Sequence, residues 1–202
     1  MRYLIAIPCL DMVHTWFMAS LLAMDRPEGT EVQICSSSLV YDSRNTLAEK
    51  AVKRGFDRVL WLDSDMVFEP DLMHRLIADM DEGRDMVCGL YFTRKAPIKP
   101  CLSRKLITHE SGRTEAVDFD SYPEDAIFEV AGAGFGVMMT SVDVIRAAGA
   151  NGRPFSPIEG WGEDYSFLLR AHKAGYKCWC DSRIKVGHAG VSIINESNWK
   201  GR

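Results

Sequence analysis

The stretch RVLWLDSDMVFEP, residues 58–70, decides the fold. An apolar run at residues 59–62 leads directly into Asp63 and Asp65, which are separated only by Ser64. An uninterrupted apolar run is typical of a strand that is buried on both faces of a parallel sheet. Side chains two positions apart on an extended segment point the same way, so the two carboxylates are expected on one face. There they repel each other unless a cation or the hydroxyl groups of a ligand separate them.

Strand and helix patterns alternate on both sides of this stretch over the first 92 residues. Apolar runs predict strands at residues 3–8, 31–37, 58–63 and 85–92. Apolar residues at helical spacing predict helices at residues 12–23 and 43–55, and a third whose first residue is Pro70. This alternation predicts a doubly wound α/β half with a parallel sheet.

The pattern changes after residue 92. Proline, charge and short β-like runs at residues 93–130 predict antiparallel strands and loops. Residues 129–141, EVAGAGFGVMMTS, read as a strand whose glycines indicate close approach of a ligand or another backbone. A helix is expected at residues 161–175 and a final strand at residues 176–180. No repeat or linker divides the chain, so we expect one domain.

Composition excludes several classes of protein. The chain has 202 residues, 47% of them hydrophobic, which suits one globular domain with a real core. Its net charge of −4 predicts no general affinity for nucleic acid or anionic membranes. No apolar run of about 18 residues is present, so no membrane span is expected. The six cysteines read as reduced structural thiols, and we expect a soluble, cytoplasmic protein.

Asp63 and Asp65 follow a strand, and ligands of open α/β sheets bind beyond the carboxyl ends of strands. Mg²⁺ or Mn²⁺, with diphosphate oxygens completing its coordination, would separate the two charges. A solvated turn is the simpler alternative. A haloacid-dehalogenase-type phosphatase is another, because DSDMV fits the pattern of its nucleophilic aspartate. That fold places the nucleophile on its first strand, however, whereas two strand–helix units precede Asp63 here.

Three further groups of residues suggest chemistry. Glu163 and Asp164 begin a helix, where acids stabilise the N-terminus. Their neighbours Trp161 and Gly162 also suit a sugar platform beside a carboxylate that takes a proton from a hydroxyl. His188 follows a strand between glycines, which permits a metal or a structural role. Arg44, near the start of a helix, would be solvated or would face a phosphate or a nucleobase.

Four motifs together resemble one family. They are DSD at 63–65, GAGFGVMM at 132–139, GWGEDYSFLLRAHKAG at 160–175 and VGHAG at 186–190. In this order they resemble GT-A-fold glycosyltransferases, especially the family 2-like and polypeptide N-acetylgalactosaminyltransferase-like groups, over nearly the whole chain. The resemblance implies an α/β, Rossmann-like GT-A fold with a mainly parallel central sheet, flanking helices and a small antiparallel portion. Within the single domain 1–202, residues 1–92 would bind the nucleotide and residues 93–202 the donor sugar and acceptor.

The resemblance also implies a role for each matching residue. The nucleotide and donor would be bound by Pro8, Arg44, Asp63, Ser64 and Gly134. The cation, Mn²⁺ or Mg²⁺, would be held by Asp65 and His188, with Asp63 as a companion on the ribose side. The acceptor would lie against Trp161 and Gly162. Asp164, or in its place Glu163, would be the catalytic carboxylate on the acceptor side.

The function implied is transfer of a sugar from a nucleotide-diphosphate donor, expected to be a UDP-sugar, to an acceptor hydroxyl. The acceptor could be a glycan, a protein, a lipid-linked sugar or a modified nucleic acid base. The second strand ends in CSSS and lacks the aspartate that many family 2 enzymes use for uracil. The alternatives are a sugar nucleotidyltransferase, for which PCLDMVHTW lacks the glycine-rich loop, and an inactive sugar- or nucleotide-binding relative.

Overall fold

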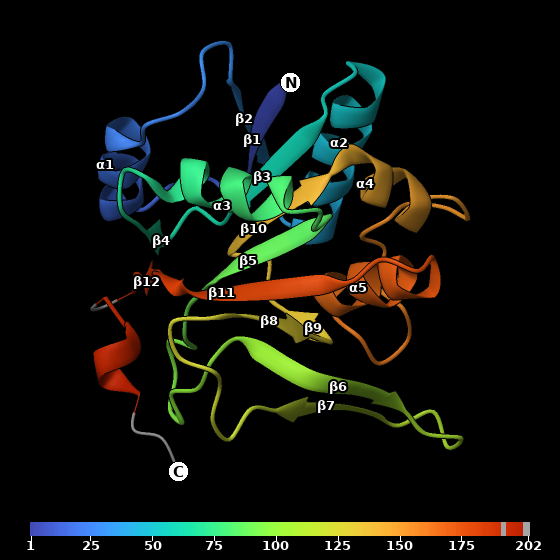
Figure 1. Cartoon of the computed structure of the whole chain (residues 1–202). Helices are drawn as coiled ribbons and strands as arrows, with labels where there is room; N and C mark the ends of the chain where they lie inside the picture. Colours follow the sequence, from blue (N-terminus) through green and yellow to red (C-terminus); the bar gives the residue numbers. More distant parts are fainter. Residues whose placement is uncertain (191–192, 200–202) are drawn as a thin grey trace.

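A seven-stranded sheet forms the centre of the protein in the computed structural model, which describes residues 1–190 and 193–199 (Figure 1). Its strands, in spatial order, are β2 (Glu31–Ser36), β1 (Tyr3–Cys9), β3 (Arg58–Leu62), β10 (Val137–Ser141), β5 (Met86–Leu90), β11 (Cys178–Lys185) and β8 (Ile127–Val130). The pairings make β10 and β8 antiparallel to the other five strands. The prediction of a mainly parallel central sheet is therefore confirmed.

Helices cover both faces of this sheet. One face packs against α1 (Thr15–Ala23) and α3 (Leu72–Asp81), and the other against α2 (Val40–Lys53), α4 (Val142–Ala148) and α5 (Glu163–Lys173). Strand β3 shows why residues 59–62 are continuously apolar. Val59 and Trp61 enter the core beneath α2, α4 and α5, while Leu60 and Leu62 enter the core beneath α1 and α3. Alternate side chains are thus buried on opposite faces, as expected for a strand covered on both sides.

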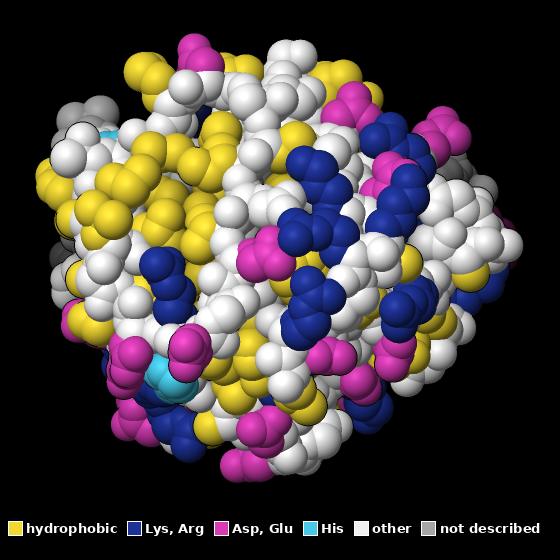
Figure 2. All heavy atoms as spheres, turned by 90° about the horizontal axis from the view of Figure 1, so that it is seen from above, with side chains coloured by type: hydrophobic (Ala, Val, Ile, Leu, Met, Phe, Trp, Pro, Cys, Tyr) yellow, Lys and Arg dark blue, Asp and Glu magenta, His cyan; other side chains and the backbone are white. Residues whose placement is uncertain are grey.

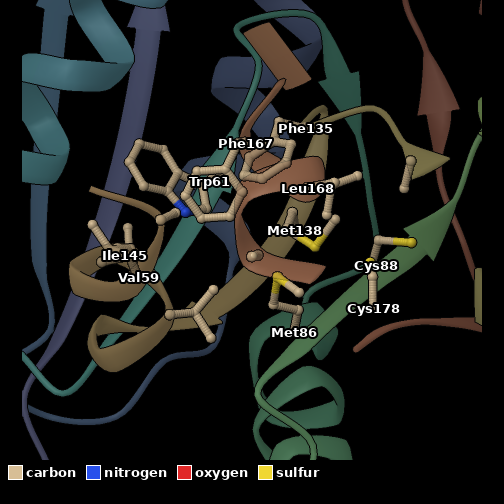
Figure 3. Packing of buried hydrophobic residues seen from close by; sticks show 14 of the residues in the cluster. Val59, Trp61, Met86, Cys88, Phe135, Met138, Ile145, Phe167, Leu168 and Cys178 are labelled. Carbon is tan, nitrogen blue, oxygen red and sulfur yellow. The ribbon is translucent and has the colours of Figure 1, made fainter. Parts of the chain in front are cut away.

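The larger core centres on Trp61, which is fully buried (Figure 3). Its indole N–H donates to Thr140 Oγ1 at 3.0 Å, which satisfies the one polar group of the ring. The rings of Phe135 and Phe155 pack edge-on against it, with centroids 6.1 and 5.0 Å away. All six cysteines lie within the described residues and are free, and Cys88, Cys178 and Cys180 are buried in this core.

Two small sheets complete the fold. The strands β7 (Thr114–Asp118), β6 (Leu102–Thr108) and β9 (Gly132–Ala133) form an antiparallel sheet, and β12 (Gly187–His188) pairs with β4 (Met66–Val67). A short 3₁₀ helix, η1 (Glu196–Asn198), follows. The antiparallel segment expected after residue 92 is therefore present. Across the described ranges, no helix combines the length and apolar character needed to cross a membrane.

The structure corrects three details of the predicted elements. Pro70 is not the first helical residue, because α3 begins at Leu72 after Asp71. Residues 129–141 are not one strand, because they end β8, form β9 and then form β10 after the segment 134–136. The final strand, β11, runs on to Lys185 and so extends the sheet toward the end where β12 follows. The short helix α4 was not predicted at all.

Hydrophobic side chains gather on one side of the face seen in Figure 2, and Lys and Arg side chains gather on another part of it. Exposed large hydrophobic residues include Trp16 and Leu22 of α1, and Val32 and Ile34 of β2. Among the described strands, β2 pairs only with β1, so it forms an edge of the sheet. This edge is apolar between its terminal residues Glu31 and Ser36, apart from Gln33.

Candidate active site

The Asp-x-Asp turn lies at the carboxyl end of β3, in the centre of the sheet. The Asp63 N–H donates to Gly136 O at 2.9 Å, and the Met66 N–H donates back to Asp63 O at 3.2 Å. Strand β4 follows at once and pairs antiparallel with β12, which places Met66 opposite His188. The turn is therefore held between the end of β3 and a segment more than 120 residues later in the chain.

Asp65 and His188 face each other across this pairing. Asp65 Oδ2 lies 3.5 Å from His188 Nε2, and His188 Nδ1 lies 2.8 Å from Phe92 O. A carbonyl oxygen can only accept, so Nδ1 carries a proton, and the ring is oriented with Nε2 toward Asp65. A backbone carbonyl that orients a ring in this way is typical of metal-binding histidines.

The separation of these two atoms suits a shared cation. Atoms that each lie roughly 2.1 Å from one metal ion are at most about 4.2 Å apart, and 3.5 Å falls within that limit. Asp65 Oδ1 is buried and has no hydrogen-bond partner among the residues described. Burial by itself would raise the pKa of Asp65, but the hydrogen bond to His188 and the charges of His188 and Arg94 together lower it. The ionised form of Asp65 is therefore favoured, and its Oδ1 is the oxygen without a partner.

Asp63 is paired with Arg44 in the structure. Asp63 Oδ1 accepts from Arg44 Nη2 at 2.9 Å, while burial raises the pKa of Asp63 despite that contact. No cluster of three or more His, Cys, Asp or Glu side chains suited to a metal occurs within residues 1–190 and 193–199. The structure brings Asp65 and His188 together but pairs Asp63 with Arg44, and the metal roles of all three stay predictions. Water and diphosphate oxygens commonly complete such a coordination shell.

Arg44 is the buried centre of the acidic side of the site. Its side chain is 1% exposed, so the interpretation of Arg44 as a solvated residue is wrong. Besides Asp63, it approaches Glu163 (Nε to Oε1, 3.6 Å) and Asp164 (Nη2 to Oδ1, 3.6 Å). Its guanidinium also lies over the ring of Phe135, 5.4 Å from the centroid. Arg44 therefore joins α2, the Asp-x-Asp turn and the start of α5.

Asp164 has the most perturbed carboxyl group of the site. Its Oδ2 accepts from the Phe135 N–H at 3.3 Å, and its buried Oδ1 has no hydrogen-bond partner in the described part of the chain. Burial, followed by the charges of Glu163 and Asp63, raises the pKa of Asp164 to about 7 although Arg44 opposes the shift. A carboxylate with a pKa near neutrality can accept a proton and release it again.

The glycines of the segment 132–136 make room for the side chain of Tyr91. A Cβ atom on Gly134 would collide with Tyr91 Oη, and one on Gly136 would lie 2.8 Å from Tyr91 Cζ. The Gly136 N–H donates to Tyr91 Oη at 3.0 Å. The sequence predicted a ligand or a backbone as the close neighbour, and the neighbour is a buried side chain instead. The role of Gly134 in donor binding stays a prediction.

Trp161 and Gly162 lie at the start of α5. Trp161 is 7% exposed, its ring N–H donates to Thr108 Oγ1 at 3.1 Å, and the ring packs edge-on against that of Tyr165. The ring therefore offers little open surface for an acceptor to stack on. Gly162 is the N-cap residue of α5, and a Cβ atom there would have no neighbour within 4 Å. An acceptor contact at either residue stays a prediction.

Pro8 and Ser64 connect the first strand to the site. Pro8 is buried in β1 and pairs in register with Cys35 of β2. The carbonyl of Ser64 accepts from the His14 N–H at 2.8 Å, so the segment after β1 is fixed to the Asp-x-Asp turn. Ser64 is part of the turn itself, and the nucleotide roles of Pro8 and Ser64 stay predictions.

Tyr91 and Arg94 lie in the candidate site but were not predicted from the sequence. Tyr91 belongs to the apolar run of β5 and its surroundings, where nothing distinguishes it from a core residue. Arg94 lies just beyond that strand, and its Nη1 contacts Asp65 Oδ2 at 2.9 Å. The signal for Arg94 was the pair of cations, Arg94 and Lys95, that follows a strand end on the same edge as Asp65.

Comparison with known proteins by sequence finds neither a matching family model nor a matching curated protein. Among solved structures, A197 from STIV is similar with a TM-score of 0.69 at 22% identity, over 94% of this chain and 86% of A197. GalNAc-T7, solved with UDP, GalNAc and Mn²⁺, is similar with a TM-score of 0.65 at 12% identity. That match covers 100% of this chain and 44% of GalNAc-T7. The chain has the GT-A fold, as its motifs predicted.

Proposed function

We propose that the protein is a metal-dependent glycosyltransferase that moves a sugar from a nucleotide-diphosphate donor, a UDP-sugar, to an acceptor hydroxyl. The observation that carries this proposal is the facing pair Asp65 and His188 at the carboxyl end of β3. The GT-A fold supports it, and GalNAc-T7, a protein of similar structure, was solved with UDP and Mn²⁺. A haloacid-dehalogenase-type phosphatase would require a different fold, so that interpretation is set aside.

The diphosphate end of the donor would lie against Asp65 and His188. These residues would hold Mn²⁺ or Mg²⁺, which, when bound, neutralises charge on the departing diphosphate. His188 is kept in the required orientation by its hydrogen bond to Phe92 O. Asp63 is fixed by Arg44, and it would accept hydrogen bonds from the ribose hydroxyls of the donor. Arg44 would thereby position Asp63, and a contact of Arg44 with the nucleotide stays a prediction.

The acceptor would approach from the side of Asp164. In an inverting reaction, Asp164 takes the proton of the acceptor hydroxyl as that oxygen attacks the anomeric carbon. In a retaining reaction, the same carboxylate accepts a hydrogen bond and positions the acceptor. Arg44, 3.6 Å away, stabilises the ionised form of Asp164 that either role needs. Glu163 approaches Nε of the same guanidinium with its Oε1 at 3.6 Å and is the alternative base.

Incubation with a panel of nucleotide sugars and Mn²⁺ tests the proposal, with UDP release measured in the presence and absence of acceptors from the four candidate classes. We expect UDP release that depends on metal, that Asp65→Ala abolishes, and that Asp164→Asn abolishes while donor binding is retained. Release of pyrophosphate would indicate a sugar nucleotidyltransferase, and donor binding without turnover an inactive relative. Transfer by Asp65→Ala at the wild-type rate would refute the metal assignment.

A further inference from the structure

Asp65 has a cationic neighbour besides His188. Arg94 Nη1 lies 2.9 Å from Asp65 Oδ2, the same oxygen that faces His188 Nε2 at 3.5 Å. The same nitrogen donates to Ala189 O at 3.1 Å, so the guanidinium is held next to the residue that follows His188. Arg94 is therefore paired with Oδ2 of Asp65, the oxygen that would ligate the divalent cation under the proposed function.

The loop that carries Arg94 has a defined shape. Thr93 Oγ1 donates to the carbonyls of Lys95 and Pro97, at 3.2 and 3.1 Å, and accepts from the Lys99 N–H at 3.2 Å. The backbone closes the same loop, because the Thr93 N–H donates to Lys99 O at 2.9 Å. This network fixes the base of the loop beside Asp65, whereas the Arg94 side chain is 47% exposed and has space to move.

We propose that Arg94 is a resident counter-ion that competes with the divalent cation for Asp65 in the donor-free protein and binds the donor diphosphate once the cation displaces it. This inference rests on the proposed function. A guanidinium and a divalent cation on one carboxylate oxygen repel each other, so they do not share Asp65 Oδ2 at close range. The displaced guanidinium remains anchored beside the metal position, and its planar set of donors matches phosphate oxygens.

This exchange couples the two ligands. Without a diphosphate, displacement of Arg94 from Asp65 by the cation costs free energy, because the ion pair is lost. When a diphosphate binds the freed guanidinium, this free-energy cost is lower. Metal and donor therefore strengthen each other's binding, and each does so by the same factor. Lys95, the next residue, has no ion pair with Asp65 among the described residues, so it provides a matched charge control.

The experiment measures Mn²⁺ affinity without nucleotide, by the electron paramagnetic resonance signal of free Mn²⁺, and then UDP affinity at saturating Mn²⁺. The variants are Arg94→Ala, Arg94→Lys and Lys95→Ala in the full chain. For Arg94→Ala we expect Mn²⁺ to bind about fivefold to tenfold more tightly, and UDP about fivefold to tenfold more weakly. Arg94→Lys is expected to lie between this variant and the wild type, and Lys95→Ala close to the wild type for Mn²⁺.

Each outcome bears on the inference. Tighter Mn²⁺ binding together with weaker UDP binding in Arg94→Ala alone supports it, because a purely structural role would not move the two affinities in opposite directions. Equal or weaker Mn²⁺ binding by Arg94→Ala, or an equal gain in Lys95→Ala, overturns it and leaves the metal site intact. If no variant and no wild-type protein binds Mn²⁺, the metal-dependent function fails, and the inference fails with it.

Discussion

Replacement of Arg44 by methionine tests the electrostatic centre of the site. Arg44→Met keeps most of the buried side-chain volume and removes a positive charge that contacts Asp63, Glu163 and Asp164. Removing one partner of a buried ion pair costs about 3–5 kcal/mol, because the remaining charges are left uncompensated. The three carboxylates are 20–31% exposed, so water solvates part of their charge and we expect the lower end of this range.

The loss of unfolding free energy caused by Arg44→Met should increase with pH. Loss of Arg44 raises the pKa values of Asp63 and Asp164 in the folded state, where burial has already raised them. When the folded pKa of a carboxyl group lies above its unfolded pKa, the free energy of unfolding of the protein falls as pH rises between the two pKa values. The destabilisation by Arg44→Met should therefore be largest near pH 8 and should shrink as pH falls toward 4 and the carboxylates become protonated.

Urea unfolding at pH 8 and pH 5, followed by tryptophan fluorescence, measures this effect. With a slope of roughly 2–3 kcal/mol per molar urea, the midpoint should fall by about 1–2 M at pH 8 and by less at pH 5. The matched control is Arg153→Met, because Arg153 is 55% exposed and pairs with Asp42 at 2.7 Å on the surface. That change should cost less than about 1 kcal/mol. Equal losses in the two variants, or a loss independent of pH, would refute the reasoning.

Three further predictions follow from the same geometry. Asp164→Asn should abolish transfer but raise the free energy of unfolding at pH 8, because the folded pKa of about 7 makes ionised Asp164 unfavourable in the folded state. This gain in stability should vanish near pH 4, where Asp164 is protonated in the folded protein. Unfolding curves at both pH values test this, and a gain that persisted at pH 4 would contradict it. In the wild type, kcat/KM for the acceptor should rise as pH increases through about 7 as Asp164 loses its proton, and a rate independent of pH between 6 and 8 would exclude Asp164 as the base. Gly134→Ala should cost about 1–3 kcal/mol because its Cβ atom meets Tyr91 Oη. Adding Tyr91→Phe should recover part of that loss in a double-mutant cycle, and strict additivity would argue against the clash.

The elements of the first half could be predicted because each carries a complete local pattern. Residues 59–62 of β3 are all apolar and are buried alternately on its two faces. Helix α2 ends beside Gly55, which has a φ of +67° that favours glycine. The insertion of β10 between β3 and β5 could not be predicted in this way. Its apolar run resembles that of its neighbours, and strand order depends on contacts between residues far apart in the sequence. Pro70 was misplaced because helix ends are set by such contacts too.

The parts of the candidate site that could be predicted are residues whose type and position after a strand suggest metal binding. Asp65 and His188 are brought together as their motifs suggested, because β4 pairs with β12. The surroundings of Arg44 were not predictable, since charge in a sequence favours exposure, and only the fold shows that three acids gather around it. The glycines near residue 134 were recognised as marking a close approach, but Tyr91, the residue that approaches, lies about 40 positions earlier.

The place of β5 in the sheet has a consequence for synthesis of the chain. Both of its strand partners, β10 and β11, are made after it, so β5 leaves the ribosome with neither edge paired. At about 5–20 residues per second, the 46 residues between Leu90 and Val137 take roughly 2–9 s to add. During that interval β5 exposes an apolar strand that other chains could pair with. The central sheet becomes continuous only when β10 inserts between β3 and β5. Gly136 directly precedes β10, and its carbonyl accepts the hydrogen bond from the Asp63 N–H. The central sheet and the Asp-x-Asp turn therefore form at the same stage of synthesis.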